Sequence, residues 1–179
     1  MDRTVDLLAR QMSDTYQGLR VRLRDLSDDE FFWEPTPDCW TVYREPSGRW
    51  TYHYEIPDPV PSPLTTIGWR VVHLALCKVI YHDWAFGPAR LRFDEIENPH
   101  DVATSIAMLE VGHRSLTQDI EAMIDDDLSL PVRTNWGDRW PAWRIFWEMT
   151  AHDAQHGAEI GALRDLYRVS GSGSRMSDR

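Results

Sequence analysis

The chain has 179 residues, of which 42% are hydrophobic, and a formal net charge of −10 at pH 7. This length fits one globular domain, and so acidic a domain repels phosphate backbones, so no nucleic-acid partner is expected. No apolar run is long enough to cross a bilayer, and Met1–Thr4 lead directly into a helical pattern rather than a signal segment. We therefore expect a cytoplasmic protein without a membrane partner.

The first predicted helix covers residues 4–26. Its apolar side chains recur at steps of three and four residues with charged side chains between them, which is the pattern of an amphipathic helix. These apolar positions are Val5, Leu8, Met12, Tyr16, Leu19, Leu23 and Leu26. Residues 27–30 are then predicted to form a turn or a short capped piece.

Residues 33–63 interrupt the helical pattern, because seven prolines in this stretch exclude a long helix. Two β-prone runs, residues 39–43 and 49–56, flank a Pro-Ser-Gly turn and predict a hairpin. An excursion of this length in a small helical domain is commonly a lid or a rim. We expect residues 40–56 to cover or flank a ligand site, with four rim candidates: Trp40, Trp50, Tyr52 and His53.

Three further helices are predicted at residues 65–86, 101–123 and 141–167, with a loop from Asp125 through Gly137 before the last of them. Four amphipathic helices of this length favour an all-α four-helix bundle, carrying the proline-rich hairpin insertion between its first and second helices. We expect one domain over residues 1–168 and a flexible tail over residues 169–179.

The most informative motif lies in the last predicted helix, where His152 and His156 are four residues apart. This spacing places two imidazoles one turn apart on one helix face, close enough to bind one metal ion. Met149 and Ile160 share that face, so both histidines point inward. His73 also lies on an apolar stripe, in the second helix, and is the first choice for a third ligand. His113, on the apolar stripe of the third helix, is the alternative.

Other residues near these histidines have simpler interpretations. Cys77, one turn after His73, is more typical of a small buried residue than of a soft ligand, and no base accompanies it or Cys39 in sequence. Glu148 and Glu159 flank the histidine pair and are interpreted as surface ion pairs rather than as bases. The other three histidines are assigned to solvated or rim positions: His53, His82 and His100.

Three neutral histidines suit Zn²⁺, Ni²⁺ or another late divalent ion, and three protein ligands with open positions are typical of a catalytic metal site. A metal held in this way makes a bound water or thiol easier to deprotonate. The chain contains no Gly-x-Gly-x-x-Gly, no P-loop and no Gly-x-Ser-x-Gly, so other common catalytic motifs do not compete with this interpretation.

Two stretches resemble motifs of a known family. Residues 65–74 (TTIGWRVVHL) are similar to the second-helix motif of the DinB-like superfamily, and residues 152–161 (HDAQHGAEIG) to its fourth-helix motif. The resemblance covers roughly residues 1–168. It implies a four-helix bundle in which three histidines hold a divalent metal, here His73, His152 and His156, and so selects His73 over His113. The insertion at 33–63 departs from the minimal family pattern.

The same resemblance implies function classes. Relatives include maleylpyruvate isomerases and thiol S-transferases that use mycothiol or bacillithiol, so we expect a metal- and thiol-dependent transferase or isomerase acting on a small electrophile. Basic residues are almost all arginine, with Lys78 the only lysine, which is similar to actinobacterial proteins whose thiol is mycothiol. The alternative is a non-catalytic metal-binding or stress-response protein. Nine tryptophans are more than one four-helix core of this size readily buries, and members of this family often dimerise through helix faces. We therefore expect a homodimer.

Overall fold

The computed structural model describes residues 3–57 and 59–171. Four long helices dominate it: α1 (Arg3–Leu23), α3 (Ile67–Ala85), α4 (Val102–Glu121) and α5 (Ala142–Val169). Between them lie short elements: α2 (Asp28–Phe31), β1 (Val42–Arg44), β2 (Trp50–Tyr52), the 3₁₀ helix η1 (Asp125–Ser129), β3 (Pro131–Arg133) and β4 (Arg139–Pro141). The predicted four-helix bundle with a hairpin between its first and second long helices is confirmed.

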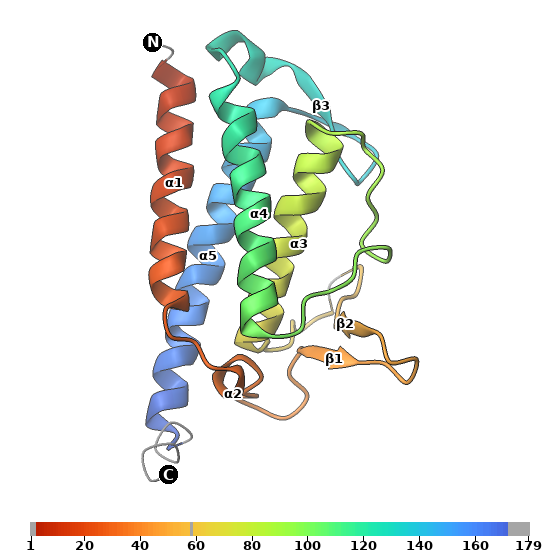
Figure 1. Cartoon of the computed structure of the whole chain (residues 1–179), viewed down its shortest axis with the longest axis vertical. Helices are drawn as coiled ribbons and strands as arrows, with labels where there is room; N and C mark the ends of the chain where they lie inside the picture. Colours follow the sequence, from red (N-terminus) through yellow and green to blue (C-terminus); the bar gives the residue numbers. More distant parts are fainter. Residues whose placement is uncertain (1–2, 58, 172–179) are drawn as a thin grey trace.

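The four long helices are aligned along one axis, with α1 and α5 running in one direction and α3 and α4 in the other (Figure 1). Going around the bundle, α1 packs mainly on α5, α5 also packs on α3, and α3 packs closely on α4. Helices α1 and α4, which complete the ring of four, make far fewer contacts than the other neighbouring pairs. Residues 86–101 return along the bundle, so that α3 and α4 run parallel (Figure 1).

The close packing of α3 on α4 depends on Gly112. A Cβ atom at this position would lie 2.8 Å from the Cβ of Lys78, closer than packed side chains allow. The small residue therefore lets the two helix backbones approach, which places the side chains of α3 between α4 and α5. Here the core contains large, fully buried side chains from three helices, including Leu74, Leu116 and Phe146.

The insertion is fastened to the start of α3. The amide of Trp40 donates to the carbonyl of Leu64 (2.8 Å), and the amide of Thr66 donates to the carbonyl of Trp40 (2.9 Å). Beyond this junction β1 and β2 pair antiparallel, with Val42 opposite Tyr52. The predicted hairpin is thus present, and Figure 1 places it beside the end of the bundle at which α3 begins.

Two boundaries differ from the sequence predictions. Helix α1 ends at Leu23 rather than at residue 26, because Asp25 adopts a left-handed conformation with φ +54° that stops the helix. The loop predicted after Asp125 is partly ordered, with η1 followed by a second antiparallel hairpin, β3–β4. Each of these strands has only three residues, which is too short for an alternating pattern to be recognised.

At the C-terminal end, α5 continues to Val169, two residues past the predicted end of the helix. Most of the predicted tail, residues 172–179, lies outside the described residues. Among the residues that the structure describes, no helix is both long and apolar enough to span a membrane.

Candidate metal centre

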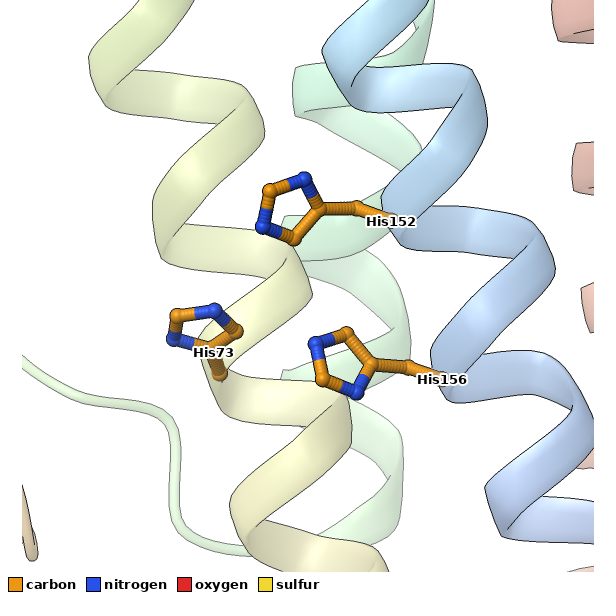
Figure 2. A group of neighbouring side chains, drawn as sticks. All are labelled: His73, His152 and His156. Carbon is orange, nitrogen blue, oxygen red and sulfur yellow. The ribbon is translucent and has the colours of Figure 1, made fainter. Parts of the chain in front are cut away.

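Helices α3 and α5 bring three histidines together, which we call the histidine cluster: His73, His152 and His156. One nitrogen atom from each ring lies within 4.8 Å of the nitrogen atoms from the other two. The ring centroid of His73 lies 5.8 Å from that of His152 and 5.3 Å from that of His156. Figure 2 shows the three rings directed into the space between the two helices. The spacing predicted on α5 therefore meets a third imidazole from α3.

The cluster is largely shielded from water. His73 is 9% exposed and His156 7% exposed, whereas His152 is only partly buried. Burial lowers the pKa of His73 and of His156 to about 3, and the neighbouring imidazoles and Arg70 add to the effect. Both rings are therefore neutral near pH 7 and keep a nitrogen lone pair, which is the form that binds metal ions.

The protein holds two of the rings through their Nδ1 atoms. The Nδ1–H of His152 donates to the backbone carbonyl of Glu148 (2.9 Å), one turn earlier on α5. Nδ1 of His156 lies 2.8 Å from the carboxylate of Glu159 and 3.0 Å from Nη1 of Arg70 on α3, and Glu159 also binds that guanidinium. Because a carboxylate accepts, we assign the proton of His156 to Nδ1, which donates it to Glu159. Bonds of this kind fix the tautomer and leave Nε2 of each ring free to coordinate a metal.

Glu148 and Glu159 are both predicted to form surface ion pairs, and the structure gives them different surroundings. The side chain of Glu148 accepts from Arg144 (3.4 Å), and only its backbone contacts His152. Glu159 lies against the cluster instead and completes a chain from Arg70 to His156. Arg70 was missed because nothing in the sequence shows that α3 lies beside this turn of α5; its position three residues before His73 is the one available signal.

Cys77 is a neighbour of the cluster rather than a member of it. Its Sγ lies 3.6 Å from Nε2 of His73. Burial raises the pKa of this thiol to about 12, and the nearby Lys78 only partly opposes the effect. The thiol therefore stays protonated and fits the interpretation of a small buried residue.

The other four histidines have other partners. His113 stacks on Tyr16 of α1, with ring centroids 3.6 Å apart, and does not join the cluster. His82 binds the carboxylate of Asp119 (2.6 Å), and His100 stacks on Trp50 (4.7 Å). Nδ1 of His53 accepts from the amide of Thr41 (3.0 Å). The structure thus brings His73, and not His113, beside the pair on α5, since α4 presents His113 to α1.

Aromatic side chains cover the His73 side of the cluster. Trp69 stacks on His73 with centroids 4.8 Å apart and planes 11° apart. Tyr54, which follows the hairpin, faces the same ring at 6.1 Å. Neither was among the predicted rim residues, although Tyr54 belongs to the predicted β-prone run.

The predicted rim residues lie one layer further out. Trp40 and Tyr52 pack on Trp69, at 6.0 and 6.1 Å between centroids. The backbone carbonyl of His53 accepts from the indole N–H of Trp69 (2.6 Å). Trp50 packs on Phe32 and His100 instead. The insertion therefore reaches the cluster through Tyr54 and through the support it gives to Trp69.

The chain matches one family model, described as the DinB superfamily, over residues 11–160. The match includes all three residues of the histidine cluster, the motif at residues 65–74 and all but the last residue of the motif at residues 152–161. No curated protein matches the chain.

Proposed function

This chain belongs to the DinB superfamily, and on that premise we propose that the histidine cluster binds one divalent metal ion, Zn²⁺ or Ni²⁺. The observation that carries the proposal is the convergence of three imidazole nitrogens within 4.8 Å. Three neutral nitrogen donors suit these ions, and a set of three leaves coordination positions open. The hydrogen bonds at Nδ1 of His152 and His156 support the same ligand set, because they leave Nε2 of each ring free to coordinate a metal.

We propose further that the protein is a metal- and thiol-dependent transferase or isomerase acting on a small electrophile, with mycothiol as the first thiol to test. A bound metal of this kind lowers the pKa of a thiol that coordinates it. The chain's own residues would orient and shield the reaction: Glu159 holds His156, while Trp69 and Tyr54 cover His73. His152, the most exposed of the three, marks the side from which small molecules would approach.

In the proposed transfer, the thiol gives up its proton and its sulfur forms a bond to an electrophilic carbon of the substrate. The leaving group, or in an isomerisation the thiol itself, departs with the electron pair of the bond that breaks. A non-catalytic metal-binding or stress-response role is the second candidate. The burial of His73 and His156 favours it, because a sealed site offers no room for a substrate.

Metal analysis followed by thiol-conjugation assays tests both candidates. We expect one equivalent of metal per chain after purification without chelators, measured by mass spectrometry. Mycothiol, bacillithiol and glutathione are then combined with a bimane electrophile, whose fluorescence reports thioether formation, before and after metal removal. Metal-dependent conjugation supports the enzyme. Stoichiometric metal without turnover favours the second candidate, and a reconstituted protein that binds neither ion contradicts both.

Three further properties are part of the proposal: a cytoplasmic location, a domain covering residues 1–168, and a homodimer in which each protomer has its own cluster. The exposed tryptophans support the dimer, because Trp136, Trp143 and Trp147 are between 42% and 51% exposed. Sedimentation at micromolar concentration tests it, since the monomer mass is 20.9 kDa. A single species of that mass would contradict the dimer.

A further inference from the structure

A second group of polar side chains lies on the other side of the bundle, where α1 and α4 touch only lightly. Two adjacent cavities of about 400 and 350 Å³ open there, and both are lined by Tyr16 and Arg20. We call this region the α1–α4 groove, lined among others by Tyr16, Arg20, Arg24, Leu109, His113 and Arg114. Cavities of this size are typical of small-molecule sites.

Two polar atoms in the α1–α4 groove are buried without a partner. Tyr16 is only 4% exposed, and its hydroxyl has no hydrogen-bond partner among the described residues. The same holds for Nδ1 of His113, whose ring stacks on Tyr16. A buried polar group without a partner is costly, and such groups in native proteins commonly bind a water molecule or a ligand. A hydroxyl and an imidazole together can donate and accept hydrogen bonds.

Tyr16 lies beside charged side chains of the smaller cavity. Glu110, Arg20 and Arg114 line that cavity together with Tyr16. Burial raises the pKa of Tyr16 to about 12; among charged side chains Glu110 and the buried Asp153 raise it further, while Arg20 and Arg114 lower it. At neutral pH the hydroxyl therefore keeps its proton and can act as a hydrogen-bond donor.

The lining has a charge opposite to that of the chain as a whole. Arg20, Arg24 and Arg114 face a single carboxylate, Glu110, in a chain of net charge −10. Arg20 pairs with Glu110, the one ion pair among these side chains in the described part of the chain. It is long (3.5 Å), with the two side chains 52% and 38% exposed, so a competing anion can replace it at little cost. Beside these charges lie apolar side chains, including Ile106 and Leu109.

We propose that the α1–α4 groove binds a small organic anion, a carboxylate or sulfonate carried on an apolar body. The anionic group pairs with Arg20 and Arg114 and accepts a hydrogen bond from the hydroxyl of Tyr16. The apolar body packs on Ile106 and Leu109. This site is independent of the histidine cluster, which α3 and α5 form on the other side of the bundle, so it stands whether or not the proposed metal site is correct.

The test uses 1-anilinonaphthalene-8-sulfonate, an aromatic sulfonate whose fluorescence rises on binding, and its neutral relative N-phenyl-1-naphthylamine. The full chain should bind the sulfonate at one saturable site and the neutral compound more weakly. Arg114→Gln should weaken sulfonate binding about fivefold, since an exposed charge contributes modestly. Tyr16→Phe should weaken it by a similar factor through the lost hydrogen bond. Arg10→Gln, an exposed α1 position outside the lining, is the matched control and should bind unchanged.

Thermal unfolding and metal content of each variant separate binding from folding. If Tyr16→Phe is unstable, Arg114→Gln and Arg114→Lys still decide the matter, because the lysine variant keeps the charge and should recover most of the affinity. Equal affinity for the sulfonate and the neutral compound would overturn the proposal. So would an Arg114→Gln variant that binds as tightly as the Arg10→Gln control.

Discussion

The histidine cluster and the α1–α4 groove are built from similar parts and differ in what surrounds them. Each contains an imidazole from an apolar stripe of a middle helix, His73 on α3 and His113 on α4, and each imidazole has its pKa lowered to about 3 by burial. His73 meets two more imidazoles, whereas His113 meets a tyrosine ring and nearby cations. The chemistry that a buried histidine can perform therefore depends on the neighbouring helix.

A buried ion pair lies between the two regions. Nζ of Lys78 on α3 donates to the carboxylate of Asp153 on α5 at 2.8 Å, and both side chains are fully buried. The same ammonium lies 5.6 Å from the centre of the Tyr16 ring, while Asp153 follows His152 in sequence. The only lysine of the chain thus adds positive charge on the groove side of the core, which helps to keep His113 neutral.

The difference between the two regions would disappear if His113, rather than a residue of the histidine cluster, bound the metal. His152→Ala should abolish stoichiometric metal binding, because two remaining imidazoles make a much weaker site. His113→Ala should keep one equivalent of metal per chain. Metal analysis of both variants decides the matter, and full occupancy in His152→Ala would show that the ligands have been misassigned.

The ion pair between the two regions should carry the largest effect on stability. Lys78→Met leaves Asp153 buried without its partner and should cost about 3–5 kcal/mol of unfolding free energy. The double variant Lys78→Met/Asp153→Leu should recover most of that loss, since it leaves no buried charge. Urea denaturation measures both. A loss below about 1 kcal/mol in the single variant would mean that water reaches this part of the core.

The hydrogen bond that orients His156 can be compared with the one that orients His152. Glu159→Gln removes the charged acceptor of the His156 Nδ1–H and should weaken metal binding about 10–100-fold. Glu148→Gln is the matched control, because His152 bonds to the backbone carbonyl of that residue and not to its carboxylate. Competition with a fluorescent chelator gives both affinities. Equal losses in the two variants would point to general charge loss rather than to orientation of His156.

The last prediction concerns the pH dependence contributed by His113. Its pKa is about 3 in the folded chain against 6.5 ordinarily, so between these values the unfolded chain binds a proton that the folded chain does not. This histidine therefore contributes stability above about pH 6.5 that is lost as the pH falls toward 3. His113→Gln should flatten the stability profile over that window. Denaturation midpoints between pH 4 and pH 7 measure how stability changes with pH. If His113→Gln leaves that change as it is in the original chain, the His113 ring is exposed to water and its pKa is not lowered.

Local sequence patterns determined much of this protein. Periods of three and four residues located the long helices to within a few residues, because burial of one helix face leaves that signal wherever the helix packs. Proline density and the β-prone runs located the hairpin, and the four-residue spacing predicted that His152 and His156 share a face. The β3–β4 hairpin was not found, because three-residue strands carry too little pattern.

Only the tertiary structure decided which side chains from different helices meet. Helical periodicity names His73 first but leaves His113 open as a partner for the pair on α5, and the DinB-like motif selects His73. The order of helices around the bundle places α3 against α5 and turns His113 toward α1. The same order brings Arg70 to Glu159 and leaves Tyr16 in the lining of a groove. Periodicity records only that a helix face is buried, whereas packing between distant segments selects the helix that covers it.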